Sequence, residues 1–310
     1  MSEPSPTETD YCDVFNHPDA DIILRSSDNV HFKTFKTILS LSSPIFKDML
    51  SIPQPPTSRA FSRNSDPLQS YKDGLPVVPL SGNCSAVKAL LSFCHPCENP
   101  TLGSLEELKA ILELARMFEI TFIPNSVEPQ LVKFAEEEPL RVYAIACIYE
   151  MRNVAVQAVR FSLRKPVDEI FPGRYAPLAI EYELISAQSI FRLQRYRVDC
   201  VAVIMGMPSN DFRNLLCGWT HHCLSCAKRS NSGKSRLAPY WSTFNDRALE
   251  ALRERPCGDT VLSLRLLAPS LKMICEDCPD KTAENMAEYV ERLSKHVDMI
   301  IAKVEITLPF

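Results

Sequence analysis

Pairs of cysteines are the residues whose type and spacing could do chemistry in this sequence. The chain has 12 cysteines among 310 residues, and six of them form three Cys-x-x-Cys pairs: Cys94/Cys97, Cys223/Cys226 and Cys275/Cys278. Random placement would give roughly 0.5 such pairs, which indicates that the spacing is selected. A gap of two residues lets both thiolates turn toward one tetrahedral metal ion, and two such pairs complete a structural zinc site.

The second and third pairs predict such a zinc site in the C-terminal half. Both lie in segments flanked by Ser, Gly, Asp and Pro, and the predicted ligands of Zn²⁺ are Cys223, Cys226, Cys275 and Cys278. Cys217 and His222 are available as substitute ligands. Residues 227–274 separate the two pairs, and this separation is longer than in compact zinc ribbons. The metal would therefore join the two ends of a helical segment. The alternative is that these cysteines fill the core as small apolar side chains.

The pair at 94–97, Cys-His-Pro-Cys, superficially matches a thioredoxin-like motif. That redox chemistry needs the first thiolate at a helix N-terminus that follows a strand. The apolar spacing of Val87, Leu90 and Leu91 instead places Cys94 at a helix C-terminus, where the helix dipole would raise the pKa of a thiol. We therefore predict a structural role for this pair.

The sequence outside the cysteine pairs lacks the features that a phosphate-binding enzyme needs. Gly233-Lys234-Ser235 imitates the end of a phosphate-binding loop, but Lys228 occupies the position of the required first glycine. Glycine is scarce, at 8 of 310 residues, which disfavours enzymes that bind dinucleotides or phosphates through glycine-rich loops. We predict a protein that is not an enzyme.

Charge and hydropathy restrict the partners and the compartment. The formal net charge is −4, so no global basic field recruits nucleic acid, and the small basic stretch from Lys228 to Arg236 is typical of a solvated surface. The sequence has no run of 18 apolar residues and no signal peptide at its start. We expect an intracellular protein of the cytoplasm or nucleus, away from membranes, with reduced cysteines.

The first half of the chain alternates between strand and helix patterns. Residues 1–16 are acidic and rich in Pro, Ser and Thr, which predicts a disordered tail, and 52–76 are rich in Pro, Ser and Asn, which predicts a flexible insertion. The pattern over 21–35 predicts a β-hairpin. Pro44 fits the first turn of a helix, so two short helices are expected to meet at Ser42-Ser43.

Further elements are predicted after the insertion. Val77 to Leu80 is strand-like, and Pro79 predicts that this strand lies at a sheet edge. Three helices are predicted before residue 139: 84–95, 105–118 and 129–138. Beyond Pro139 the strand patterns end, and five helices are predicted: 140–163, 177–185, 186–203, 239–255 and 282–304. The apolar stripe on the last helix indicates a core face.

The hairpin and the two helices after it carry a longer motif. The residues from Asp19 to Asp28, continued from Phe32 to Met49, resemble the start of a BTB/POZ domain, with D-[IV]-x-[LF], a turn, and then F-x-x-H-[KR]-x-x-L-x-x-x-S-x-x-F-x-x-M. The match is especially similar to the expanded BTB family of mushroom-forming fungi. It covers about residues 17–135 well and the helical remainder more loosely.

The resemblance implies an α+β, mostly helical fold in two domains. A BTB/POZ domain with a short mixed sheet flanked by helices is expected at 17–138, and an all-α domain at 139–310. The family implies a homodimer through the first strand and the first helix, and recruitment of other proteins. Asp21 and Lys36 match the buried acid–base pair of the family's charged pocket, whereas Phe35 replaces the family histidine.

The residues by themselves leave two interpretations of Asp21. An aspartate inside an apolar strand is costly unless it is paired, and Lys36 is a reasonable partner. Alternatively, Asp21 faces water at the start of the hairpin.

The predicted function is a non-enzymatic protein–protein interaction module, a homodimerising BTB scaffold or adaptor that recruits partner proteins. One alternative is a zinc-dependent module for binding nucleic acid or protein in the C-terminal half, as in a transcription-associated regulator. The other is a cullin-type ubiquitin-ligase substrate adaptor.

Overall fold

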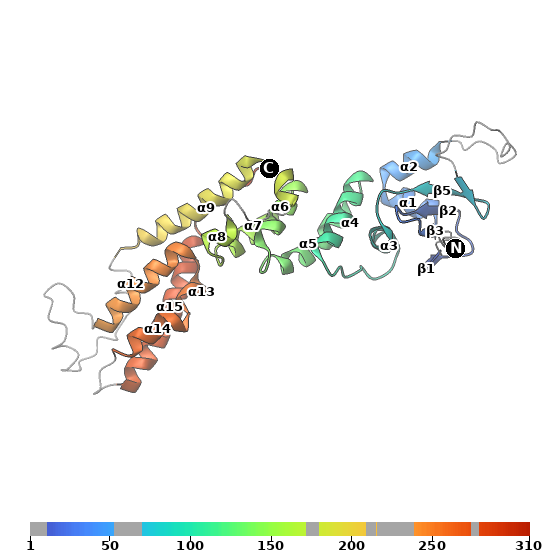
Figure 1. Cartoon of the computed structure of the whole chain (residues 1–310). Coiled ribbons are helices and arrows are strands. Elements are labelled where there is room, and N and C mark those ends of the chain that lie inside the picture. The colour runs from blue at the N-terminus through green and yellow to red at the C-terminus, as the bar shows by residue number, and fades with distance from the viewer. Residues whose placement is uncertain (1–10, 53–69, 172–179, 209–214, 216–238, 274–278) are drawn as a thin grey trace, which may run out of the picture. The chain divides into compact units, whose positions relative to one another are not determined.

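A computed structural model describes residues 11–52, 70–171, 180–208, 215, 239–273 and 279–310 (Figure 1). The chain divides into two compact units, residues 1–134 and 135–310, called here the first and the second unit. Their boundary lies four residues before the predicted one at 138. No helix in the described ranges is long and apolar enough to cross a membrane.

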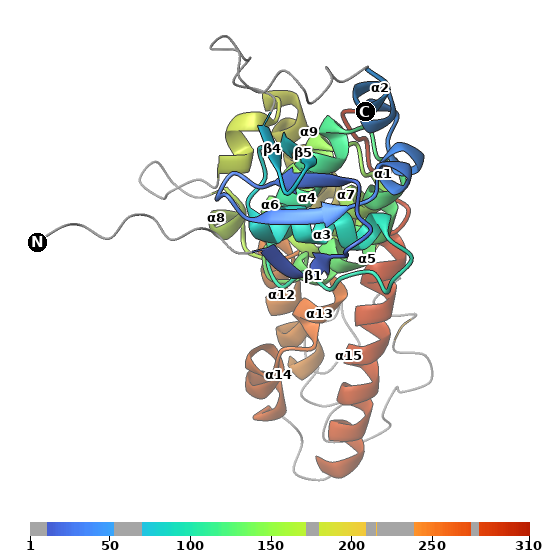
Figure 2. The same cartoon turned by 90° about the vertical axis from the view of Figure 1, so that its right-hand side faces the viewer.

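The first unit is built on a mixed sheet of five strands in the order β1-β3-β2-β5-β4. The strands are β1 (Tyr11–Asn16), β2 (Ile22–Arg25), β3 (His31–Thr34), β4 (Ser70–Lys72) and β5 (Leu75–Pro79). The predicted hairpin is confirmed, because β2 and β3 pair antiparallel around a turn in which Asn29 has a φ of 64°. The strand β1 runs parallel to β3, and β5 runs parallel to β2. Figure 2 shows β1 on one side of the sheet and β4 and β5 on the other.

Three expectations for this sheet are wrong. Residues 11–16 are not tail but form β1, and residues 70–76 of the expected insertion form β4 and the start of β5. The strand β5 is not an edge strand, because β4 pairs with it on the outer side. Pro79 fits there because it lies beyond the last residue paired with β4, while Leu80 supplies the N–H that bonds Arg25 O at 2.8 Å.

Five helices of the first unit are described: α1 (Lys36–Ser42), α2 (Pro44–Ser51), α3 (Cys84–Cys94), α4 (Leu105–Met117) and α5 (Phe122–Phe134). The predicted junction at Ser42-Ser43 is confirmed. The Ser43 hydroxyl accepts the Phe46 N–H at 3.0 Å and donates to Phe118 O at 2.5 Å. The Phe46 ring stacks on Phe118 with centroids 4.2 Å apart, so this junction fixes α2 against the end of α4.

Local caps begin the next two helices. The Asn83 side chain accepts the Ala86 N–H at 2.9 Å at the start of α3. Ser104 accepts the Glu107 N–H at 3.2 Å at the start of α4, and Glu107 accepts the Gly103 N–H in return. The core beneath these helices consists of fully buried residues, among them Ile22, Ile23, Leu24, Phe32, Leu90, Leu91, Leu108 and Ile111.

The second unit is helical throughout its described residues, as predicted. Its elements are α6 (Pro139–Ile148), α7 (Arg152–Ser162), α8 (Val167–Ile170), the 3₁₀ helix η2 (Ile180–Leu184), α9 (Ala187–Met205), α12 (Pro239–Glu254), α13 (Gly258–Val261), α14 (Leu264–Leu271) and α15 (Pro279–Ile301). The stripe on α15 is confirmed as a core face. Its Tyr289 ring meets Trp241 and Phe244 of α12 edge-on.

Two of the differences between predicted and observed helix boundaries have a clear physical reason. The single helix expected over 140–163 is broken at Glu150, which has a φ of 55° and ends α6 in a left-handed conformation, with the Met151 N–H bonded to Ala146 O. The helix expected from Pro129 begins earlier, at Phe122, and Pro129 lies inside it. The burial of apolar residues on either side of Pro129 outweighs the hydrogen bond that a proline cannot make.

Candidate interaction surface

Three elements of the first unit each present a large apolar side chain to solvent. Leu41 on α1 is 84% exposed, Val14 on β1 is 66% exposed, and Ile45 on α2 is 36% exposed. Next to them, Leu39 and Phe15 are buried, so one face of each element packs into the core while the other is free. Large apolar side chains that remain exposed on these elements make them candidates for an interaction surface.

The strand β1 is also an edge of the sheet. Among the described residues it is the terminal strand and pairs with β3 alone, and its register shifts between the pairs Tyr11↔His31 and Asn16↔Lys33. An edge strand presents unpaired N–H and C=O groups along its outer side, which form a template for pairing with another chain. Val14 therefore lies on a strand that is suited to contact a partner.

A polar cluster holds the start of β1 in place. The Tyr11 hydroxyl donates to the Asp73 carboxylate at 2.6 Å, and the ammonium groups of Lys33 and Lys72 lie 4.4 and 4.8 Å from the centroid of the Tyr11 ring. Burial, and next the hydrogen bond to Asp73, raise the pKa of Tyr11 to about 12. The phenol therefore remains a hydrogen-bond donor at neutral pH.

Aromatic contacts hold the end of β1 beside the start of α1. The His17 ring, just after β1, lies 5.4 Å from the ring of Phe35, the residue before α1. The Phe15 ring lies 5.2 Å from His95, which also contacts Thr34 of β3 at 3.3 Å. Phe35, which replaces the family histidine, thus packs as an aromatic residue between the strand and the helix.

Asp21 and Lys36 are in contact, but not as a buried acid–base pair. Asp21 is exposed in the single chain, and its carboxylate accepts the backbone N–H of Lys36 at 2.7 Å. Within the described residues the Lys36 ammonium makes no ion pair with it. The physical reason is that Phe35, at the N-cap of α1, offers no side-chain acceptor, so the Asp21 carboxylate satisfies the first N–H of that helix.

The Cys94/Cys97 pair lies at the C-terminus of α3, as predicted. The Cys97 thiol donates to Ser92 O at 3.1 Å, and burial raises the pKa of the Cys94 thiol. A thiol that stays protonated at neutral pH is a poor nucleophile. Both observations agree with a structural role.

The predicted zinc ligands Cys223, Cys226, Cys275 and Cys278 lie outside the described residues. The substitute ligands Cys217 and His222 and the basic stretch 228–236 lie outside them as well. In the part of the chain that the structure describes, no three His, Cys, Asp or Glu side chains are grouped so that they could hold a metal ion.

The interaction surface contains residues that sequence reasoning missed, above all those of β1. The signal was present, because Tyr11 to Phe15 is rich in aromatic and β-branched residues. The acidic, Pro/Ser/Thr-rich composition of residues 1–10, directly before the strand, outweighs this signal in the sequence.

Comparison with known protein families finds that residues 13–135 match the BTB/POZ domain. The match begins inside β1 and ends just after α5, so it spans the sheet and the five helices of the first unit. A search of curated proteins finds no match. Domains of this family are in general non-enzymatic modules. The first unit of this chain, over residues 13–135, is therefore a BTB/POZ domain, and the chain carries a protein–protein interaction module.

Proposed function

We propose that the chain is a homodimeric scaffold or adaptor whose BTB/POZ domain pairs with a second copy through β1 and α1 and recruits other proteins. The observation that carries the proposal is the exposure of Leu41, which is 84% accessible on a helix whose opposite side is anchored by buried Leu39. Burial of a leucine contributes about 1.5–3 kcal/mol. In a two-fold dimer each such contact occurs twice, so burial of Leu41 would contribute to the free energy of dimerisation once from each copy.

The free edge of β1 supports the same surface. The contact between His17 and Phe35 holds the end of β1 at the start of α1, so a partner that meets one element also meets the other. The Tyr11 cluster fixes the other end of the strand. A strand that is held at both ends loses little conformational freedom when a second copy binds to it.

The test is sedimentation velocity of the full chain and of two matched variants. Leu41→Glu places a charge on the proposed interface, and we expect it to convert a dimer into a monomer. Leu264→Glu is the control, because Leu264 is 77% exposed in the second unit and outside the proposed interface. This control is expected to sediment as the wild type.

A strictly monomeric wild type at tens of micromolar would reject the proposal. A Leu41→Glu variant that stays dimeric and folded by circular dichroism would place the dimer contact elsewhere and would reject the role of α1.

A cullin-type ubiquitin-ligase adaptor and a transcription-associated regulator are two specific forms of this proposal. They differ in what a tagged chain should retain from cells: cullin and ligase subunits in the first form, chromatin-bound proteins in the second. Affinity purification with mass spectrometry separates them. The Leu41→Glu variant then shows which partners need the dimer.

We also propose a structural zinc site in the second unit, on the strength of the two Cys-x-x-Cys pairs that end at Cys226 and Cys278. Metal analysis of the purified chain is expected to find one zinc ion per chain. The Cys223→Ser and Cys275→Ser variants are expected to lose it. An absence of stoichiometric zinc in the wild type would reject this site.

A further inference from the structure

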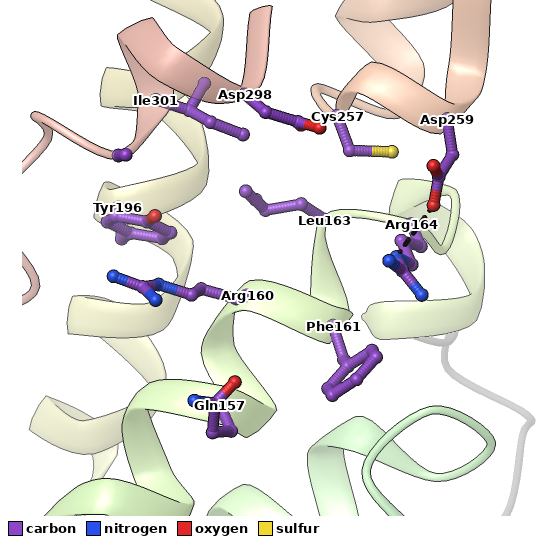
Figure 3. A pocket seen from close by; sticks show the side chains of 11 residues that line it. Gln157, Arg160, Phe161, Leu163, Arg164, Tyr196, Cys257, Asp259, Asp298 and Ile301 are labelled. Atoms are coloured by element: carbon purple, nitrogen blue, oxygen red, sulfur yellow. Dashed lines mark ion pairs between the residues drawn. The ribbon is translucent and has the colours of Figure 1, made fainter. Parts of the chain in front are cut away.

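A cavity of about 290 Å³ lies inside the second unit, between α7, α9, α13 and α15 (Figure 3). Its apolar lining includes Leu163, Ile301 and the ring of Tyr196. Small-molecule sites typically occupy about 300–1,000 Å³, so this cavity lies at the lower limit of that range. It has room for a small molecule but not for a helix or strand of a partner protein.

One wall of the cavity carries an arginine that is available to a ligand. Arg160 of α7 is exposed, and its side chain makes no hydrogen bond or ion pair with any residue that the structure describes. Figure 3 shows its guanidinium beside the Tyr196 ring. Arg164 also lines the cavity, but its guanidinium already forms ion pairs with Asp259 at 3.0 Å and Glu136 at 3.3 Å. Arg160 is therefore the cation that can bind an anionic group here.

The wall formed by α15 carries the carboxylate of Asp298, of which one oxygen accepts a hydrogen bond from the protein and the other accepts none among the described residues. Asp298 Oδ1 accepts the Gly258 N–H at 2.7 Å, and its Oδ2 has no hydrogen-bond donor within the described ranges. In Figure 3, Leu163 lies between Asp298 and Arg160. The cavity thus offers a negative group and a positive group that are separated by an apolar floor.

The walls are held in place without a ligand. Arg197 of α9 donates to Ser162 O at 2.9 Å, to Lys165 O at 2.7 Å and to Glu254 O, so it joins α7, α9 and α12. The ion pair of Arg164 with Asp259 joins the end of α7 to α13. Because the walls of the pocket are already fixed, ligand binding carries little entropic cost of ordering them.

We propose that this cavity binds a small amphoteric molecule, whose anionic group meets Arg160, whose ammonium group meets Asp298, and whose apolar body covers Leu163 and Ile301. A free apolar amino acid is the simplest molecule of this class. The site lies wholly in the second unit, and it does not depend on the proposed dimer.

The test is isothermal titration of the full chain with L-phenylalanine, L-phenylalanine amide and N-acetyl-L-phenylalanine. The amide lacks the carboxylate, and the acetyl derivative lacks the ammonium group. We expect phenylalanine to bind and each derivative to bind at least about tenfold more weakly, because each loses one charged contact.

Variants of the chain give the complementary result. Arg160→Gln and Asp298→Asn are each expected to weaken phenylalanine binding about tenfold. Asparagine keeps an oxygen for the Gly258 N–H, so the fold is retained, which the melting temperature checks. The matched control is Arg152→Gln, at an exposed arginine of α7 that does not line the cavity, and it is expected to bind as the wild type.

Three outcomes would overturn the proposal. The first is no binding of phenylalanine by the folded wild type. The second is that phenylalanine amide or N-acetyl-phenylalanine binds as tightly as phenylalanine, since the site would then not recognise both the carboxylate and the ammonium group. The third is unchanged binding by a folded Arg160→Gln variant.

Discussion

The two units end their helices in different ways. In the first unit, short side chains close by in sequence do this work: Ser43, Asn83 and Ser104 each accept an N–H three residues further on. The second unit also has such an N-terminal cap, in which Ser186 accepts the Ser189 N–H at 3.2 Å, but there one long side chain satisfies helix C-termini from a distance as well. Arg197 donates to the carbonyl of Ser162, the last residue of α7, and to that of Glu254, the last residue of α12.

The difference has consequences for stability and for function. A local cap satisfies one helix and can be lost at the cost of that helix alone. A buried arginine that satisfies carbonyls of two other helices couples all three, because none of them can move without leaving a buried polar group unpaired. The surface proposed for interaction in the first unit lies on the outside, on β1 and α1, while the second unit has a cavity whose walls Arg197 fixes.

The largest expected effect comes from removal of this coupling. Arg197→Met retains most of the side-chain volume, but it leaves the carbonyl groups of Lys165 and Glu254 without a donor among the described residues and leaves Ser162 O with the Lys165 N–H alone. We expect it to lower the free energy of unfolding of the second unit by about 3 kcal/mol. Tryptophan fluorescence in a urea titration measures it. Both tryptophans, Trp219 and Trp241, belong to residues 135–310 and so report on this unit.

The matched control for Arg197 is on the same helix. Arg195 is an exposed residue whose ion pair with Asp199 spans 3.8 Å, so Arg195→Met is expected to change the free energy of unfolding by no more than about 0.5 kcal/mol. If the two variants had equal effects, the coupling through Arg197 would be refuted.

The same difference explains which features the sequence could predict. The junction at Ser42-Ser43 and the caps at Asn83 and Ser104 depend on residues within four positions of one another, so a local pattern reveals them. The strand β1 depends on a pairing with β3, about 20 residues later, and the acidic, Pro/Ser/Thr-rich composition of the residues before it hides its strand pattern. Local reasoning therefore found the hairpin and missed the strand beside it.

The cavity could not be predicted for a similar reason. Arg160, Asp298 and Tyr196 come from three helices that are widely separated in sequence, and no spacing rule relates them. Asp21 is an intermediate case. The sequence predicted its contact with Lys36, but which atoms meet depended on the position of the α1 terminus, where the backbone N–H of Lys36 needed an acceptor.

The next largest effect is expected at Gly258, where α13 approaches α15 most closely. A Cβ at this position would lie 2.5 Å from Ser294 O and 2.5 Å from Asp298 Oδ2. Because Ser294 O belongs to the backbone of α15, it cannot turn aside, and Gly258→Ala must push the two helices apart. We expect a loss of about 2 kcal/mol in the free energy of unfolding of the second unit, followed by tryptophan fluorescence.

The control for Gly258 is a glycine of the first unit that has space around it. A Cβ at Gly103 would have its nearest neighbour, Glu107 Oε2, at 3.8 Å. Gly103→Ala is therefore expected to be nearly neutral, which the thermal melting of the first unit followed by circular dichroism measures, since that unit holds no tryptophan. A neutral Gly258→Ala variant would show that α13 and α15 are not as tightly joined as the contact implies.

The smallest expected effect belongs to a contact of the first unit that joins the turn between β2 and β3 to the start of α3, and it depends on pH. Asp28, in the turn between β2 and β3, accepts the Cys84 N–H at 2.8 Å, and hydrogen bonds from Ser26 and then from Cys84 lower the pKa of its carboxyl. The unfolded chain therefore takes up this proton at a higher pH than the native chain does. The stabilisation is complete above the unfolded pKa and is lost as the pH falls through the native one.

Because Asp28 is exposed, Asp28→Ala should cost only about 0.5 kcal/mol at pH 7. Hydrogen exchange of the first turn of α3 measures the difference from wild type, which should shrink toward zero below pH 3.8. A difference that stays constant as the pH falls would mean that the charge of Asp28 does not stabilise the start of α3, and that this contact acts through its shape alone.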